Sequence, residues 1–342
     1  MGTVAGSTME VNELDPSTLS DDDAAALAAV ANAAQVVDAP HLDPVDAEHV
    51  RRRHAYDHDM HPTHALLVAR DGAALAGYAE VSISHWDNPD LAFIDLEVHP
   101  DHRGGGVGST LSRWVEEVTR RVGRTRLMTD GWLDSPKQAF WRRRGFTLGM
   151  VAAQRRLVMA DLDQGRLGRL LAQAEAASSD YELVDVPNPA AEEMVPDLLA
   201  VHSAINDAPL DDLALDPDAW PAERVRAYER AMTARGFQLH RLLARRRSDG
   251  APGGHTVVVV ERDRPWIASQ EDTAVVAAHR GHRLGLRLKI AMLHRLAELE
   301  PQLRHIDTWN AESNKHMLAV NNAIGCVVVG RSAELQRTSS PA

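Results

Sequence analysis

Cysteine, long apolar runs and net positive charge are scarce or missing in this sequence. A single cysteine, Cys326, excludes a disulfide within the chain. No apolar run approaches the roughly 20 residues that a membrane-spanning helix needs, so we expect no membrane partner. The segment Met1–Glu10 has neither the basic nor the apolar stretch of a secretory signal. These absences predict a cytoplasmic protein.

The shortage of positive charge bears on the choice of partner. The chain has 37 Lys and Arg residues against 49 Asp and Glu residues, which gives a formal net charge of −12. Such a chain is repelled by a phosphate backbone unless a local basic face compensates, so we expect no nucleic acid partner. The same acidity favours a cationic substrate such as an amine. The composition leaves open whether the protein is a monomer or a homodimer.

The sequence contains an internal repeat with a period of about half the chain. With 342 residues, the chain is long enough for two domains with separate cores. A strand-like segment meets an Arg-Gly turn and then a helix-like segment at residues 96–108 and again at residues 273–285, with an offset of 177 residues. Downstream, residues 140–146 match residues 320–326 with an offset of 180. Two landmarks in the same order indicate a tandem arrangement.

Both copies predict the same order of helices and strands. Ser20 is a suitable N-cap for a helix, and Asp71-Gly72 indicates a hairpin. A strand over residues 92–98 precedes an amphipathic helix, whose apolar positions are Val107, Leu111, Trp114, Val118 and Val122. We predict an α+β fold with two tandem domains, each a mixed twisted β-sheet flanked by helices. Their expected limits are residues 1–160 and 181–342, joined by a helix and linker over residues 161–180.

The glycine-rich turn at residues 103–108 suits a phosphate. The first N–H groups of a helix lack intrahelical partners, and glycines let the backbone approach an anion closely. Arg103 can add a charge-assisted bond. No Gly-Lys-Ser/Thr follows, which excludes a Walker loop, and Leu111 stands where a dinucleotide fold has a third glycine. The alternative is a tight strand-to-helix connection without a ligand.

Residues 98–108 read Val-His-Pro-Asp-His-Arg-Gly-Gly-Gly-Val-Gly and resemble the acetyl-CoA motif of the GNAT acetyltransferase superfamily. Residues 140–146 resemble the family's second motif, and the tandem arrangement is similar to that of mycothiol synthase-like proteins. The resemblance implies that acetyl-CoA is the co-substrate, with strand amides on the pantetheine and turn amides on the pyrophosphate. The residues so implied in the first half are Leu96, Val98, Arg103, Gly104, Gly105, Gly106, Val107, Gly108 and Ser109.

The second half departs from the motif, because Arg283 occupies the position of the first signature glycine and Cys326 replaces a phenylalanine. The Arg283 side chain either crowds the phosphates or binds them. The residues implied for binding in this half are Thr273, Val275, Arg280, Gly281, His282, Arg283, Leu284, Gly285, Asn310, Asn314 and Asn321. The alternative for the three asparagines is capping and filling of the helix that begins near Ser313.

Acetyl transfer to an amine needs a base and a means of stabilising the leaving thiolate. Strand alternation places Asp95 and Glu97 on one face, and the family often has a Glu base there, so Glu97 is the first candidate and Asp95 the second. In the repeat, Asp272 corresponds to Asp95. In the family the usual general acid is a tyrosine. The corresponding positions hold Trp141 in the first half and Asn321 in the second.

A histidine cluster in the first half, His54, His58, His61 and His64, contains an i, i+4 pair. No Cys or Glu completes a ligand set, so we predict a polar loop beside the substrate and no metal.

The sequence therefore predicts an acetyl-CoA-dependent N-acetyltransferase acting on a primary amine of a small molecule by direct transfer. The first half is the better catalytic candidate. Two alternatives stay open: a catalytic second half with a structural first half, or an acyl-CoA-binding scaffold without turnover.

Overall fold

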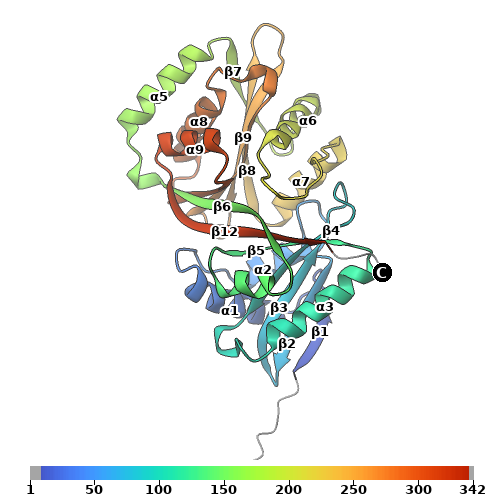
Figure 1. The fold of residues 1–342 in the computed structure, drawn as a ribbon. Helices are drawn as coiled ribbons and strands as arrows, with labels where there is room; N and C mark the ends of the chain where they lie inside the picture. The colour runs from blue at the N-terminus through green and yellow to red at the C-terminus, as the bar shows by residue number, and fades with distance from the viewer. Residues whose placement is uncertain (1–8, 339–342) are drawn as a thin grey trace, which may run out of the picture. The chain divides into compact units, whose positions relative to one another are not determined.

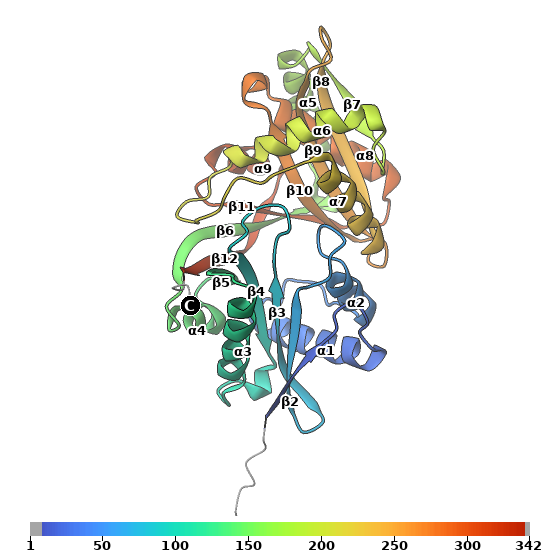
Figure 2. The same cartoon turned by 90° about the vertical axis from the view of Figure 1, so that its right-hand side faces the viewer.

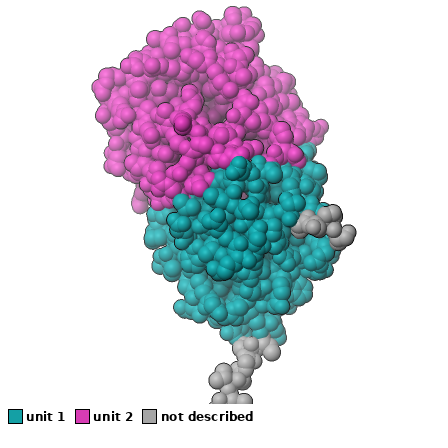
Figure 3. Space-filling view, in the orientation of Figure 1, with its two compact units in different colours: residues 1–150, 212–214, 332–342 teal, residues 151–211, 215–331 magenta. Residues whose placement is uncertain are grey.

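The computed structural model describes residues 9–338. It divides into two compact units (Figure 3). The first runs through residue 150 and includes residues 212–214 and those from 332 onwards, and the second comprises residues 151–211 and 215–331. No helix in the described part of the chain has both the length and the apolar character needed to cross a membrane.

The first unit is a mixed sheet between two helical layers. Its helices are α1 (Asp21–Asp38), α2 (Ala47–Ala55), α3 (Val107–Arg121) and α4 (Pro136–Arg142). Its strands, in sheet order, are β1 (Glu10–Leu14), β2 (Ala65–Asp71), β3 (Ala74–Ser82), β4 (Leu91–Val98), β5 (Arg126–Trp132) and the end of β12 (Val327–Thr338). β4 and β5 are parallel, and the other pairs are antiparallel. Figure 2 shows α3 and α1 on opposite sides of this sheet.

Alternating residues of the strands fill the two layers of the first core. Leu67 and Ala69 of β2 pack with the α3 side of the sheet, whereas Leu66 and Val68 pack with α1. The amphipathic pattern expected for α3 is present, because Val107, Leu111, Val115 and Val118 are buried. Trp114 is the exception: 47% of it is exposed, since it lies outside the buried stripe.

Local signals of the sequence account for several element ends. The Ser20 hydroxyl accepts a hydrogen bond from the amide of Asp23 at 3.1 Å, which confirms the predicted N-cap of α1. The β2–β3 turn has Gly72 at φ +61°, as the Asp-Gly pair predicted. Asn314 caps α9 (Lys315–Ile324) in the same way, so the capping interpretation of this asparagine is correct.

The second unit repeats the plan of the first. Its helices are α5 (Gln164–Ala177), α6 (Val195–Ser203), α7 (Ala222–Ala234), α8 (Leu284–Leu299) and α9. Its strands, in sheet order, are the end of β6 (Thr147–Val158), β11 (His305–Ala311), β10 (Ile267–Val275), β9 (Pro252–Glu261), β8 (Phe237–Arg246) and β7 (Tyr181–Val186). β10 and β11 are parallel and are labelled in Figure 2, whereas Figure 1 labels the other strands of this sheet.

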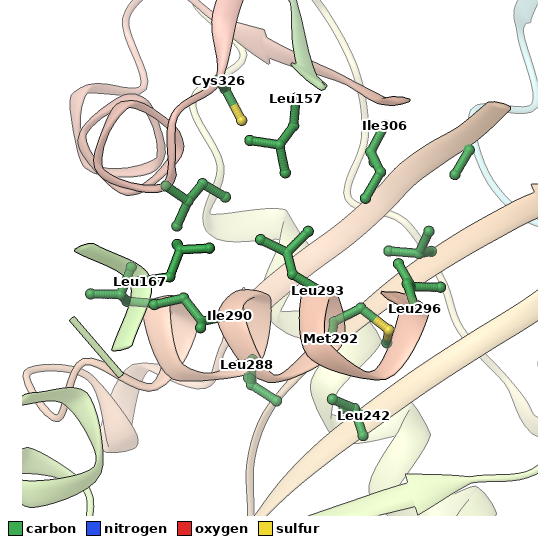
Figure 4. Packing of buried hydrophobic residues seen from close by; sticks show 14 of the residues in the cluster. Leu157, Leu167, Leu242, Leu288, Ile290, Met292, Leu293, Leu296, Ile306 and Cys326 are labelled. Carbon is green, nitrogen blue, oxygen red and sulfur yellow. The ribbon is translucent and has the colours of Figure 1, made fainter. Parts of the chain in front are cut away.

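The core of the second unit is built around α8. Leu288, Ile290, Leu293 and Leu296 are at most 4% exposed and meet Leu242 of β8 (Figure 4). Cys326 lies in the same cluster and is buried, as its position in place of a phenylalanine predicted. On the other face of the sheet, α6 and α7 cover alternate residues of β8 and β9.

Strand pairing places the unit boundaries elsewhere than the expected limits of residues 1–160 and 181–342. Residues 152–158 of β6 pair with β11 and so belong to the second unit, although we expected them to close the first domain. Residues 332–338 of β12 pair with β5 and belong to the first unit. The expected linker region, residues 161–180, is mostly helix α5 and is part of the second unit.

A buried ion pair makes one strong stability prediction for the second unit. Glu229 accepts a hydrogen bond of 2.6 Å from Arg241, and both side chains are at most 2% exposed. Glu229→Ala leaves the Arg241 charge buried and unpaired, so we expect a loss of about 3–5 kcal/mol of unfolding free energy. Urea unfolding followed by circular dichroism measures it. Glu182→Ala, which removes the exposed partner of Arg247, is the control and is expected to cost below about 1 kcal/mol.

Candidate active site

The turn between β4 and α3 has the backbone of an anion site. Gly104 and Gly106 have φ of +79° and +89°, a region in which a side chain is strained. α3 begins at Val107, so its first amide groups are available at the turn. At position 108 glycine is favoured by lack of space, because a Cβ there would lie 3.2 Å from the Phe140 ring. The geometry therefore favours glycine at positions 104, 106 and 108 of the motif.

A cavity of about 380 Å³ opens beside this turn in the first unit. It contains most of the residues expected to bind the co-substrate: Leu96, Val98, Arg103, Gly104, Gly106, Val107, Gly108 and Ser109. Glu97 also lines it. The sequence analysis did not single out its other lining residues as a set: Asp38, His102, Pro136, Lys137, Phe140, Arg143 and Arg144. Gly105 is exposed at the turn.

Arg103 lines the cavity, and its guanidinium also has partners within the protein. Its guanidinium forms two hydrogen bonds to the Asp38 carboxylate, at 3.0 and 2.6 Å, and its Nε donates to the Val98 carbonyl at 3.2 Å. Arg103 therefore fastens the turn to α1 and β4. The other Lys and Arg residues on the cavity wall are Lys137, Arg143 and Arg144, and Arg144 donates to the Ser109 hydroxyl at 2.7 Å.

The strands separate next to the cavity. β4 and β5 pair from Leu91↔Arg126 to Ile94↔Thr129, and no pairing follows beyond that point. β4 continues against β3 as far as Val98. The edge of β4 that faces β5 over residues 95–98 is thus available for an extended ligand, as the resemblance implied for pantetheine.

The two candidate bases share one cation. Lys137 Nζ lies 2.6 Å from Asp95 Oδ1 and 2.7 Å from Glu97 Oε1. Burial raises the pKa of Glu97, and Lys137 only partly offsets this effect. Burial also disfavours the Asp95 carboxylate, but Lys137 and Arg53 outweigh it and hold its pKa at about 2. Glu97 is therefore the better proton acceptor of the pair.

Further carboxyl groups continue the row across the sheet. Glu80 faces Asp95 across β3 and β4, and Glu334 faces Asp130 across β12 and β5. Burial raises the pKa of Glu80 and of Glu334 to about 7, and it also raises the pKa of Asp130. We call these residues the carboxylate row: Glu80, Asp95, Glu97, Asp130 and Glu334. Its close cations are Lys137 and Arg53.

The corresponding turn of the second unit keeps the backbone shape. Gly281 has φ +87°, and Arg283 adopts φ +53° at the position of Gly106. α5 lies against this turn: Gln173 accepts from Arg283 at 3.0 Å, and His282 lies 3.4 Å from the Ala177 carbonyl. Arg280 donates to the Val275 carbonyl at 3.1 Å, just as Arg103 does to Val98. One side chain and one backbone carbonyl of α5 thus engage the second turn.

The other residues implied for the second site have partners within the unit. Asn321 is fully buried, donates to Asn310 at 2.7 Å and accepts from Lys289 at 2.8 Å. The Thr273 hydroxyl lies 2.8 Å from that of Thr256. Leu284 is in the core and Gly285 lies next to Val275. Buried asparagines held in this way are poorly placed to meet a ligand, so the filling interpretation fits Asn321.

Asp272 lies beside two histidines that the sequence analysis did not consider. Its Oδ2 is 3.6 Å from Nδ1 of His202, and the ring of His202 is 4.7 Å from that of His255. The residue pattern carried no signal for this grouping, since the three positions are far apart in the chain.

The histidine cluster of the first half is dispersed. His54 is buried and lies 3.3 Å from the Thr63 hydroxyl, whereas His61 stacks on His85 with ring centres 3.9 Å apart. Trp141 is 2% exposed and packs on Phe146, so it serves the core and supplies no acid.

Comparisons with known proteins agree with this geometry. Residues 32–146 match the model of the acetyltransferase (GNAT) family. Streptothricin acetyltransferase of Streptomyces lavendulae is 40% identical over 86 residues, which cover 24% of this chain and 42% of that protein. The chain therefore matches less than half of the length of this relative.

Two solved structures share the fold of the whole chain. A tandem GNAT protein from the clavulanic acid biosynthesis pathway has a TM-score of 0.77 and 22% identity, covering 98% of this chain and 99% of its own. A GCN5-related N-acetyltransferase from Sphaerobacter thermophilus has a TM-score of 0.69 and 16% identity, with 96% and 95% covered. Residues 32–146 thus match the GNAT acetyltransferase family, and the chain as a whole shares the fold of a tandem GNAT protein.

Proposed function

We propose that the first unit is an acetyl-CoA-dependent N-acetyltransferase that acts on a primary amine of a small cationic molecule by direct transfer. One observation carries the proposal: a single cavity is lined both by the glycine turn and by Glu97 and Lys137. A phosphate site and a proton acceptor thus share one space. The relative that acetylates streptothricin supports the reaction type.

The residues of this cavity fit acetyl-CoA. The turn at residues 104–108 suits the pyrophosphate, and Arg143 and Arg144 add positive charge on the wall. The unpaired edge of β4 over residues 95–98 suits the pantetheine amides. Bound there, acetyl-CoA supplies the thioester carbonyl that the amine attacks.

The second unit is the weaker candidate. Its turn is engaged by Gln173 and Ala177 of α5, and Ala274 stands at the position of Glu97. We propose that it supports the first unit and binds no acetyl-CoA.

Glu97 is proposed to take the proton from the ammonium form of the acceptor, directly or through a water molecule. Its raised pKa makes it a better base than an ordinary glutamate. Lys137 stays charged, because burial is outweighed by Asp95 and Glu97, which keep its pKa well above the usual value. A fixed ammonium on the wall stabilises negative charge that develops on the thioester oxygen or on the leaving thiolate. It offers an electrostatic substitute for the missing tyrosine.

The carboxylate row points to a cationic acceptor. It contains more carboxyl groups than its two close cations, Lys137 and Arg53, neutralise. A second positive charge on the acceptor relieves the repulsion among these groups and is attracted to them. A charge at about 4 Å from a carboxylate gains a few kcal/mol near a protein surface.

A matched pair of amines tests this proposal. We expect 1,5-diaminopentane to be acetylated with a kcat/KM at least about 10-fold higher than that of 5-aminopentan-1-ol, which corresponds to about 1.4 kcal/mol. The release of CoA thiol by the full chain measures the rate. Equal rates for the two amines, or a preference for the zwitterion 6-aminohexanoate, contradict the cationic acceptor. Acetyl-CoA binding without thiol release for any amine favours the scaffold alternative.

A further inference from the structure

Two histidines and one aspartate converge in the second unit from three different elements. His202 belongs to α6, His255 to β9 and Asp272 to β10. One ligand atom of each lies within 4.8 Å of the others. The grouping is the one cluster of three or more possible ligands found among residues 9–338.

Both histidines are buried, and the Asp272 carboxylate lies 3.6 Å from Nδ1 of His202. His202 is 2% exposed and His255 is 1% exposed, and neither ring has a hydrogen bond from either nitrogen. A buried polar atom without a hydrogen bond is costly, and two neighbouring rings with this deficit call for an explanation. The histidines do not take part in the chemistry proposed for the first unit.

The surroundings hold the rings in place. The Trp220 ring stacks on His202 with centres 4.1 Å apart and an angle of 14° between the planes. His202 and His255 meet edge to face at 82°. Asp272 is the accessible member, with 31% of its side chain exposed. An ion can therefore enter past Asp272 and find two fixed imidazoles behind it.

We infer that His202, His255 and Asp272 bind one divalent transition-metal ion of the Zn²⁺ type. Two imidazole nitrogens and one carboxylate oxygen are a ligand set that Zn²⁺ accepts, with a further position left for water or another ligand. Metal–ligand distances of about 2.0–2.1 Å limit the separation of two ligand atoms to about 4 Å. Because the ligand atoms are at most 4.8 Å apart, binding needs them to approach one another by no more than about 1 Å.

The sequence predicted no metal, and the histidine cluster at residues 54–64 lies in the first unit, whereas this site lies in the second. The ion would join α6 to β9 and β10 and would bind one of the two buried nitrogens of each ring. It is independent of the proposed acetyl transfer, since Asp272 and the two histidines are outside the cavity of the first unit.

Metal titration of the full chain tests the inference. After chelation and dialysis, calorimetry with Zn²⁺ is expected to give one site per chain, and Co²⁺ is expected to produce a visible absorption band. Mg²⁺ is the negative control, since it prefers oxygen ligands. Co²⁺ is also expected to quench the emission of Trp220, an effect absent in Trp220→Phe.

Variants locate the ion. Asp272→Asn and His202→Ala are expected to weaken Zn²⁺ binding at least ~10-fold, whereas His294→Ala, which removes an exposed histidine of α8, leaves it unchanged. Asp272 is partly exposed, so its variant remains informative even if the buried histidine variants fail to fold. No Zn²⁺ site in the wild type, or Zn²⁺ binding that Asp272→Asn leaves intact, overturns the inference, as does Mg²⁺ binding of equal strength.

Discussion

Glu97→Gln is expected to lower kcat by ~10²–10⁴-fold and to leave the Kd for acetyl-CoA unchanged. Glutamine keeps the size of the side chain and its contact with Lys137, but it cannot accept a proton. Steady-state rates of thiol release and a calorimetric titration measure the two quantities. Glu116→Gln is the matched control, because it removes a carboxylate of α3 that pairs with Arg337 and does not line the cavity.

The pH dependence of kcat/KM is a second test of Glu97 as the base. Burial raises the pKa of Glu97, so its carboxylate is lost at a higher pH than that of an ordinary glutamate as the solution is acidified. We therefore expect kcat/KM to fall on the acid side of neutrality in the wild type, and the residual rate of Glu97→Gln to lack this limb. Full activity in Glu97→Gln rules out Glu97 as the base and favours the alternative in which the second unit is catalytic.

The glycine turn could be predicted from the sequence, because its conformation depends on residues that are close together in the chain. Gly104 and Gly106 are needed for positive φ, and the helix that follows begins where the apolar pattern begins. The alternation along β4 also follows from the sequence: Ile94 and Leu96 are buried, whereas Phe93 is exposed. These features depend on neighbours within a few residues.

Contacts between distant segments escaped the sequence analysis. Asp38 lies 65 residues before Arg103 and takes up its guanidinium, and Lys137 reaches Glu97 from 40 residues away. A weak signal for Lys137 exists: it is a cation in the first turn of α4, where the helix dipole disfavours it, so a partner outside the helix is to be expected.

One further landmark of the repeat is visible only in the structure. A Cβ at Gly77 would lie 2.6 Å from the carbonyl oxygen of Glu97, and one at Gly254 would lie 2.6 Å from that of Ala274. The two glycines share the offset of 177 residues, and both allow β3 or β9 to approach the next strand closely. The sequence did not predict that the end of β6 pairs in the second unit and the end of β12 in the first. Each of these segments has the pattern of an ordinary closing strand of its own half.

Gly105→Glu is expected to weaken acetyl-CoA binding at least ~100-fold, whereas His282→Glu at the matching position of the second unit leaves the affinity and a stoichiometry of one per chain unchanged. Gly105 is exposed and lies outside the positive-φ region, so a side chain there adds charge without backbone strain. A carboxylate about 4 Å from a phosphate is repelled by about 4 kcal/mol at the effective dielectric of a protein surface. Calorimetric titration gives both the Kd and the stoichiometry.

Gly105→Gln separates charge from bulk, since glutamine has the size of glutamate and no charge. If repulsion of the pyrophosphate is the cause, Gly105→Gln binds much more tightly than Gly105→Glu, and the difference shrinks as salt is added. Two acetyl-CoA sites in the wild type, with one lost in His282→Glu, contradict the assignment of the co-substrate to the first unit alone. The contacts of Gln173 and Ala177 argue for a single site, because they already engage the side chains of Arg283 and His282 at the second turn.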